Sequence, residues 1–251
     1  MPHDLVALVE ERIAADDIEL PVFPASAQEV LTLCDRPEID AKKLASVIQH
    51  DASLAGHFLS IANSAAFRVG PPLVSLQQAL TRLGTRQTKH VAIVVVCKTR
   101  AFVDREHPDR AAELLTHALT TATYAQEIAR SRRLNVEEAF LAGLLHDIGR
   151  PAILQACADM GASRTSIDGC CKLLHERVGG IIAKRWSMRD NIVDAITTHH
   201  AEDAKGIVAI VQLADVLAHG QRDLSQHPAA DLLNLYPDDI EKLVGKVEMA
   251  A

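Results

Sequence analysis

A histidine–aspartate pair at the end of an apolar helical segment constrains this chain more than any other feature. The segment AFLAGLLHDIG places His146 and Asp147 directly after Leu144 and Leu145. Burying two ionisable groups costs free energy of desolvation unless a partner compensates them. A metal ion is one such partner, because it binds imidazole nitrogen and carboxylate oxygen together. A helix C-terminus at which the two side chains bond each other is the alternative, and the pair alone does not decide between them.

Further histidines and an aspartate lie in similarly apolar surroundings on neighbouring helical segments. These positions are His117, His175, His199, His200 and Asp215. One buried histidine usually has a structural explanation, but separate structural explanations for every position in this series are improbable. Helical bundles build metal sites in this way, with ligands that project inward from facing helices. The pattern therefore predicts a buried metal site centred on the pair at 146–147.

The distribution of helix signals predicts an all-α fold. Hydrophobic residues make up 48% of the chain but aromatic residues only 3%, so aliphatic side chains must build the core, which favours packed helices. Asp40, Ser75 and Asn135 are placed as N-caps, and Glu138 would complete a capping box. The β-branched run Val91–Val96 has strand propensity, but its flanks favour a buried helix. We expect helices over about 4–16, 41–50, 76–83, 110–130, 135–149, 168–186, 190–200 and 206–220.

A polar connection divides the predicted helices into two lobes. Residues 101–109 (AFVDREHPD) contain Pro108 and separate two helix-rich stretches. We therefore predict an N-terminal helical lobe at residues 1–104 and a second lobe at residues 105–251. All of the predicted metal ligands fall in the second lobe.

Charge and cysteine content indicate the compartment and exclude some partners. The net charge is −7 and no Lys/Arg-rich run occurs, so we expect neither DNA nor RNA as a partner. Five cysteines without a CxxC motif are typical of a protein in a reducing cytosol. The acidic N-terminal stretch lacks the apolar core of a signal peptide, and the longest apolar run, Val91–Cys97, is too short to span a membrane. We expect a soluble, cytoplasmic protein with no membrane association.

The order H…HD…H…HH…D, with the string LAGLLHDIGR, resembles the HD superfamily of metal-dependent phosphohydrolases. The segments HERVGGIIAKRW, AITTHH and LADVLA narrow the resemblance to the HDOD group of bacterial signalling proteins. The N-terminal strings LPVFPASAQEVLTLC, VIQHDASLAGHFLSIANSAAF and SLQQALTRLG match the same group. The resemblance covers about residues 18–220. It implies a helical bundle of HD-domain type with an additional N-terminal helical lobe.

The related HD-GYP phosphodiesterases imply a role for each ligand position. By that resemblance, one divalent metal ion would be held by His117, His146, Asp147 and Asp215. Asp147 would bridge to a second ion held by His175, His199 and His200. Fe, Mn, Ni, Co and Zn all accept such ligands, so the resemblance leaves the metal open. Two such ions would generate a nucleophile from water at neutral pH and clamp a phosphoryl oxygen, which makes Asp147 and Arg150 the catalytic candidates.

Two further positions could suggest metal ligands, but each has an ordinary structural explanation. Glu113, one helical turn before His117, matches a position that supports a third metal in some relatives, but an exposed helix carboxylate is our preferred interpretation. His50–Asp51 looks like a second HD pair, yet it lies within the QHDASLAGHFLSIANS block, for which the resemblance implies no metal role. The other histidines have no matching partners and are expected at the surface or in packing: His3, His57, His90, His107, His219 and His227.

Departures from the phosphodiesterase pattern leave the function open. Arg150 replaces the lysine of the HDIGK string, and no GYP motif follows the paired histidines in HHAEDAKGIVAIV, so a loop that recognises cyclic di-GMP is not evident. A regulatory module that acts through a signalling protein partner, with a nucleotide or other phosphoester as a further ligand, is our first interpretation. An active metal-dependent phosphohydrolase or phosphodiesterase is the second, and a scaffold with a metal-free histidine core is the third. Fold alone cannot choose between them, so the enzyme question stays open here.

Overall fold

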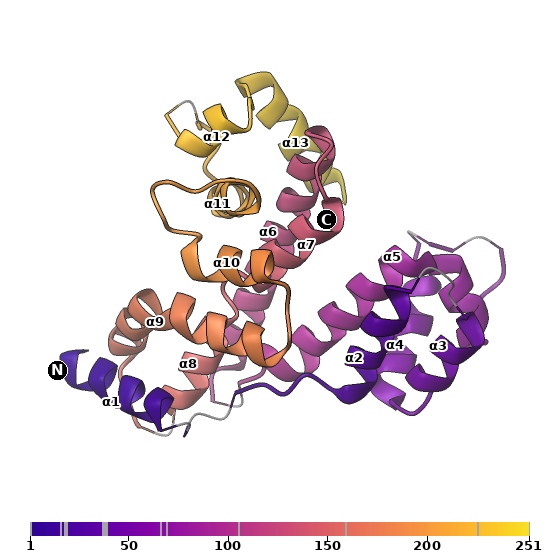
Figure 1. Ribbon diagram of the computed structural model, residues 1–251, viewed down its shortest axis with the longest axis horizontal. Coiled ribbons are helices and arrows are strands. Elements are labelled where there is room, and N and C mark those ends of the chain that lie inside the picture. Colours follow the sequence, from indigo (N-terminus) through magenta and orange to yellow (C-terminus); the bar gives the residue numbers. More distant parts are fainter. Residues whose placement is uncertain are drawn as a thin grey trace. The chain divides into compact units, whose positions relative to one another are not determined.

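The computed structural model describes residues 2–15, 17, 20–36, 40–65, 67–68, 70–104, 106–158, 160–224 and 226–250. Over these residues the chain forms helices and no strands, which confirms the predicted all-α fold class (Figure 1). None of the helices in these ranges combines the length and the apolar character that crossing a membrane requires. Asp16, the predicted end of the first helix, and the side chain of His3 lie outside the described residues.

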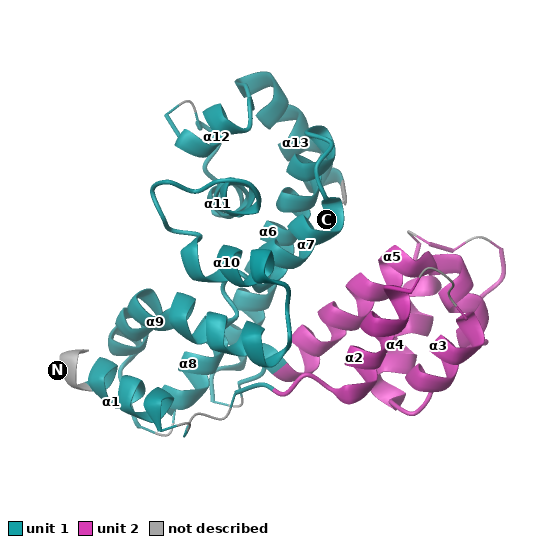
Figure 2. Cartoon of the chain, viewed as in Figure 1, with its two compact units in different colours: residues 1–21, 101–251 teal, residues 22–100 magenta. Residues whose placement is uncertain are grey.

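The chain forms two compact units, and it enters the second only after completing one helix of the first (Figure 2). Unit 1 comprises residues 1–21 and 101–251, and unit 2 comprises residues 22–100. We predicted lobes of 1–104 and 105–251, whereas the structure groups α1 (Pro2–Ala14) with the C-terminal part of the chain. The reason is that α1 packs against residues that lie far away in the sequence. Val9 of α1 is fully buried, and the Arg12 guanidinium donates to the backbone carbonyl of Ala156.

Unit 2 is built from α2 (Ala25–Cys34), α3 (Ala41–Ile48), α4 (Ala52–Ala62) and α5 (Leu76–Val96), and a π-helical turn at Cys97–Ala101 follows α5. Two predicted N-caps are confirmed. The Asp40 carboxylate accepts from the backbone N–H groups of Lys42 and Lys43, and the Ser75 hydroxyl accepts from that of Gln78. These side chains satisfy donors that the first turn of a helix cannot satisfy by itself.

The long helix α5 carries one side of the unit 2 core. Val91–Val96 lies within it, mostly buried, which confirms the helical interpretation of that β-branched run. We predicted an end near Leu83, but α5 kinks at Gly84, where φ is +71°, and then continues. A positive φ is readily adopted by glycine, so the chain can bend there without ending the helical segment. The core that packs against α5 includes fully buried Phe58 of α4.

Unit 1 contains α6 (Pro108–Ser131), α7 (Val136–Leu145), α8 (Gly149–Ala158), α9 (Arg164–Arg185), α10 (Asp190–Thr198), α11 (Ile207–Ala218), α12 (Pro228–Leu232) and α13 (Pro237–Ala250). Helix α6 packs against α7 and α11, while α8 and α10 both pack against α9. The predicted helices of this region are all present, with their ends shifted by a few residues. The core residues of these helices are largely Ala, Ile, Leu and Val, as the low aromatic content implies.

The start of α7 follows the prediction in part. Asn135 is the N-cap, and its side-chain oxygen accepts from the backbone N–H groups of Glu137 and Glu138. The predicted capping box is wrong, because the Glu138 carboxylate accepts from the side chains of Arg189 and Asn191 instead. These donors belong to the start of α10, so Glu138 links two helices rather than closing the end of its own.

Two glycines allow unit 1 helices to approach backbone to backbone. A Cβ atom at Gly143 would lie 2.8 Å from the Cα of Ala122, and one at Gly149 would lie 2.1 Å from the carbonyl oxygen of His175. No side chain fits either position without moving a neighbouring helix. The close contacts of α7 with α6 and of α8 with α9 therefore depend on glycine, and they determine how near the histidines of these helices come.

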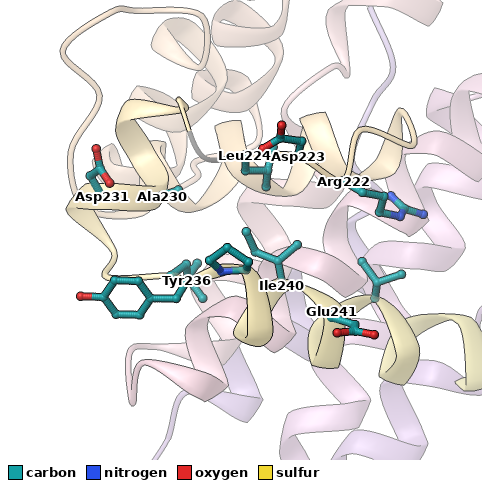
Figure 3. A pocket seen from close by; sticks show the side chains of 11 residues that line it. Arg222, Asp223, Leu224, Ala230, Asp231, Tyr236, Ile240 and Glu241 are labelled. Carbon is teal, nitrogen blue, oxygen red and sulfur yellow. The ribbon is translucent and has the colours of Figure 1, made fainter.

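The C-terminal helices enclose a cavity of about 660 Å³ (Figure 3). Its walls come from the segment before α12, from the end of α12 and from α13, with Leu224, Ala230 and Ile240 among the apolar lining residues. None of the predicted metal ligands lines this cavity. The candidate functional site is elsewhere in unit 1.

Candidate metal centre

The structure brings all seven predicted ligand residues together inside unit 1. His117 comes from α6, His146 and Asp147 follow the end of α7, and His175 comes from α9. His199 and His200 follow α10, and Asp215 comes from α11. Their ligand atoms form three overlapping groups within 4.8 Å: His117, His146 and Asp215; His146, Asp147 and His199; His175, His199 and His200. We refer to the first group as the α6 pole and to the last as the α9 pole.

The Asp147 carboxylate lies between the two poles. Its Oδ2 is 3.5 Å from Nε2 of His146 in the α6 pole. Its Oδ1 is 3.5 Å from Nε2 of His175 and 3.7 Å from Nε2 of His199 in the α9 pole. Only 7% of the side chain is exposed, so this charge is almost withdrawn from water. A carboxylate placed in this way can serve two cations at once, one through each oxygen.

Backbone hydrogen bonds orient three of the imidazoles. Nδ1 of His146, His175 and His199 lies 2.8, 2.7 and 2.9 Å from the backbone oxygens of Gly143, Cys171 and Ile196. A carbonyl can only accept, so in each neutral ring Nδ1 carries the proton and Nε2 keeps its lone pair. Metal-binding histidines are commonly fixed by such a bond on the other ring nitrogen.

The Nε2 lone pairs of two of these rings then face one another. Nε2 of His175 lies 3.2 Å from Nε2 of His199, and in the tautomer given above neither atom has a proton to share. Two facing lone pairs repel unless a proton or a cation lies between them. The arrangement therefore favours a bound cation in the α9 pole.

Several buried polar atoms of the cluster have no hydrogen-bond partner within the described part of the chain. They are Nε2 of His146, Oδ1 of Asp147 and Oδ1 of Asp215. Oδ1 of Asp215 lies 3.0 Å from Nε2 of His117 and 3.6 Å from Nε2 of His146, but without hydrogen-bond geometry. An unsatisfied buried polar atom costs about 1–3 kcal/mol, and more if charged. Divalent cations in the two poles would satisfy these atoms, and the mixture of imidazole and carboxylate suits Fe, Mn, Ni, Co or Zn.

Electrostatics keep the two carboxylate ligands in the protonation state that metal binding requires. Burial alone would raise the pKa of Asp147, but His146, His199 and Arg150 outweigh burial and hold that pKa well below its usual range. Burial likewise opposes ionisation of Asp215, yet the imidazoles of His117 and His146 lower its pKa. Both carboxylates are therefore ionised at neutral pH.

Two imidazoles of the α9 pole, those of His175 and His200, are neutral. Burial is the main cause that lowers the pKa of His175 to about 4, although the Asp147 carboxylate opposes the shift. Burial and the neighbouring His199 also lower the pKa of His200. A neutral imidazole is the form that binds a metal ion, so these two rings need lose no proton at neutral pH.

Arg150 is the cation nearest to the carboxylate at the centre of the cluster. Its Nε lies 2.6 Å from Oδ2 of Asp147, and the side chain retains 29% of its exposure. The guanidinium thus balances part of the Asp147 charge and still reaches solvent. In this position it can bind an anionic ligand next to the metal ligands.

Sequence reasoning missed two residues of the site. His219 was expected to lack partners, and this is wrong although 65% of its side chain is exposed. Its Nδ1 lies 3.0 Å from the backbone oxygen and 3.1 Å from Oδ1 of Asp215, and its ring centroid lies 4.5 Å from that of His117. The i,i+4 spacing from Asp215 on α11 was a signal for this contact. Glu176 accepts from the backbone N–H of His200 at 3.3 Å, and only its position after His175 hinted at this role.

The remaining candidates lie apart from the cluster. Glu113 is exposed and belongs to none of the three ligand groups found in the described residues. Asp51 is the N-cap of α4, where its carboxylate accepts from the backbone N–H of Leu54 at 2.9 Å and from the Ser26 hydroxyl at 3.2 Å. Nδ1 of His50 bonds to the backbone oxygen of Ser46. The second HD pair thus has a structural role in unit 2.

A groove of about 580 Å³ opens beside the metal ligands. Its lining comes from the segment that follows α10, from α11 and from the start of α12. The lining residues are His199, His200, Ala201, Glu202, Gln212, Asp215, Val216, His227 and Pro228. A ligand bound in this groove would contact both poles of the cluster.

The profile of the HDOD domain family matches residues 20–202. This chain belongs to the HDOD family. The predicted family membership is therefore confirmed, and the matched residues include every predicted metal ligand except Asp215.

Solved structures share the fold of this chain over nearly its whole length. One, from Shewanella amazonensis SB2B and provisionally named a metal-dependent phosphohydrolase, has a TM-score of 0.77, 19% identity, and coverage of 99% of this chain and 98% of its own. An HDOD domain protein of unknown function from Geobacter sulfurreducens has a TM-score of 0.70 at 22% identity, covering 99% and 95%. A provisionally named signal transduction protein from Marinobacter aquaeolei VT8 has a TM-score of 0.68 at 21% identity, covering 99% and 64%. At these identities the likeness is one of fold.

Curated relatives are longer than this HDOD chain. An uncharacterized protein of Treponema pallidum (strain Nichols) is 22% identical over 231 residues, which cover 84% of this chain and 44% of the relative. Ribonuclease Y of Mycoplasma mycoides is 31% identical over 132 residues, which cover 52% and 28%. The chain thus spans less than half the length of these relatives.

Proposed function

We propose that this HDOD protein is a cytoplasmic, bacterial signal-transduction module that binds two divalent metal ions and regulates a protein partner. One observation carries the metal assignment: the buried Asp147 carboxylate lies within 3.5 Å of an imidazole Nε2 in each pole, and its Oδ1 has no hydrogen-bond partner among the described residues. The similarity in fold to a protein named for signal transduction, and the absence of a GYP motif, support the regulatory role.

The proposed ligand sets follow the two poles. His117, His146 and Asp215 would hold one ion together with Asp147. His175, His199 and His200 would hold the second, with Asp147 as the shared ligand. Glu176 and His219 would support ligands of these sets, through the contacts to His200 and Asp215 described above.

A metal-dependent phosphohydrolase is the second candidate, and the groove beside the cluster favours it. A space of about 580 Å³ that reaches His199, His200 and Asp215 can admit a ligand of nucleotide size. When bound, a pair of divalent ions supplies Lewis acidity toward a phosphoryl oxygen and makes water nucleophilic at neutral pH. Arg150 would orient the phosphate, and the buried side chains would hold this constellation rigid.

Metal analysis of protein purified without an affinity tag tests the metal centre. We expect close to two equivalents of Fe, Mn, Ni, Co or Zn in the wild-type protein and a loss of metal in Asp147→Ala. Asp51→Ala is the matched control, because it removes the aspartate of the other HD pair and should keep the metal. Absence of any divalent metal above background in the wild-type protein would refute the centre.

A turnover screen separates the two candidates. Metal-loaded protein is assayed with cyclic dinucleotides and with generic phosphoesters, and Asp147→Ala serves as the negative control. Metal-dependent hydrolysis that disappears in Asp147→Ala would establish the enzyme. A fully metal-loaded protein without turnover on the panel supports the regulatory module.

A further inference from the structure

Metal ligands and other residues together line the groove beside the metal cluster. The ligands among them are His199, His200 and Asp215. Glu202, Gln212 and His227 provide the other polar side chains, and Val216 and Pro228 provide apolar surface. No lysine or arginine occurs among the described residues that line the groove.

The polar lining side chains that are not metal ligands have defined hydrogen-bonding capacity. Nε2 of Gln212 donates to the backbone oxygen of Ala201 at 2.6 Å, so its Oε1 is left as an acceptor. Nδ1 of His227 accepts from the backbone N–H of Ala229 at 3.2 Å, so the neutral ring carries its proton on Nε2. Burial lowers the pKa of His227 and keeps this ring neutral. With the carboxylate of Glu202, these side chains offer a donor and several acceptors but no fixed cation.

The net charge of the metal-loaded site limits the charge of a ligand that the groove can hold. Two divalent ions and Arg150 would bring five positive charges to the site. The carboxylates of Asp147, Asp215 and Glu202 remove three of them, and Glu176 lies beside His200 as a further negative charge. At most two positive charges remain, which balance a single phosphate dianion. A second phosphate near Glu202 would face a carboxylate instead of a cation.

We infer that the ligand of this groove is a phosphate monoester whose alcohol part is neutral and rich in hydrogen-bonding groups, such as a nucleoside or a sugar, with no second phosphate. The phosphate lies beside the metal ligands His199, His200 and Asp215, and the alcohol part contacts Glu202, Gln212 and His227. This inference rests on the proposed metal centre, and it applies to a regulatory ligand and to a substrate alike.

Two ligands that share one nucleoside test the inference. Adenosine 5′-monophosphate and adenosine 3′,5′-bisphosphate are titrated calorimetrically into the full chain loaded with Mn²⁺. They differ by one phosphate on the alcohol part, the part expected near Glu202. We expect the monophosphate to bind at least about tenfold more tightly, because the second phosphate would meet the Glu202 carboxylate without a compensating cation.

Two charge-reversal variants, one inside the groove and one outside it, test whether Glu202 causes the preference for the monophosphate. Glu202→Lys adds a cation to the lining and should bring the affinities of the two ligands to within about threefold of each other. Asp203→Lys makes the same change one residue away, at an exposed position that does not line the groove, and should leave the ratio unchanged.

Three results would overturn the inference: equal or tighter binding of the bisphosphate by the wild-type protein, binding of neither ligand, or equal changes in the ratio for both variants. The Mn²⁺ content of the same samples separates the sources of failure. If the wild-type protein binds no Mn²⁺, the proposed metal centre fails and the inference fails with it. If it binds Mn²⁺ without preferring the monophosphate, only the inference fails.

Discussion

Nε of Arg150 lies 2.6 Å from Oδ2 of Asp147, so the residue at the centre of the candidate metal cluster is paired with a guanidinium one helical turn away. Asp147 is almost fully buried and Arg150 is partly exposed. An ionised carboxylate at this depth needs a cation, because its charge is poorly solvated. Arg150 and the proposed metal ions therefore compensate the same charge.

Arg150→Ala should destabilise the metal-free protein and be rescued by metal. Loss of the guanidinium leaves the Asp147 charge less compensated, and we expect a loss of about 2 kcal/mol, below the range for fully buried pairs because Arg150 is partly exposed. Divalent ions should restore most of this loss, since they bind the same carboxylate. Thermal unfolding with chelator and with Mn²⁺ measures both effects. An unchanged melting temperature of the metal-free variant would contradict the coupling.

Gly149→Ala should disrupt the metal cluster from outside the ligand set. The new Cβ would lie 2.1 Å from the carbonyl oxygen of His175, so α8 and α9 must separate. We expect a loss of about 2–3 kcal/mol, typical of overpacking, and weaker binding of the ion in the α9 pole. Gly169→Ala is the control on α9, because nothing lies within 4 Å of its Cβ and it should be neutral or slightly stabilising. Equal stability and metal content for both variants would rule out this close helix contact.

The metal-free protein should lose stability as the pH falls from 6.5 to 4, in part because of His175. Burial lowers the pKa of this imidazole from 6.5 to about 4, so over this window the unfolded chain binds a proton that the folded chain does not. The contribution of His175 to the free energy of unfolding is fully present above pH 6.5 and falls by about 3 kcal/mol by pH 4. Urea unfolding at several pH values in the presence of a chelator measures the slope.

His175→Gln isolates the contribution of His175 to that slope. Other titrating groups remain in both proteins, including His146, whose pKa is raised by Asp147 and Asp215 although burial opposes the shift. The wild-type protein should therefore show the steeper loss of stability between pH 6.5 and 4. Parallel pH profiles for the two proteins would show that His175 does not titrate as its burial requires.

Phe58→Ala should destabilise unit 2 while leaving the metal ligands in place. Phe58 is fully buried in the core of unit 2, and such truncations cost about 3–5 kcal/mol. All seven proposed ligands lie in unit 1, so we expect metal content to stay at the wild-type level in protein that remains folded. Denaturant unfolding followed by metal analysis checks both parts. Complete loss of metal at a denaturant concentration that unfolds only unit 2 would contradict this independence.

The sequence predicted helix N-termini correctly where the stabilising contact joins residues that are close in the chain. Asp40, Ser75 and Asn135 cap helices as expected, because an N-cap bond joins a side chain to backbone groups two or three residues away. The capping box at Glu138 failed because side chains from the start of α10 provide better donors. Those donors are more than fifty residues away in the chain, and no local pattern reports them.

The sequence by itself determined that six of the seven proposed ligands are buried or half-buried, because ionisable residues within apolar helical runs face the interior. His200, which follows the end of α10, is exposed. The sequence also sufficed to identify the HDOD family. Only the tertiary structure gave the distances from Asp147 to the two poles and showed that His219 and Glu176 contact their ligands. It also decided that α1 packs in unit 1 and that a groove adjoins the ligands, with no Lys or Arg among its described lining residues. The physical reason is that helical periodicity specifies directions around one axis, whereas distances between helices depend on packing, as at Gly143 and Gly149.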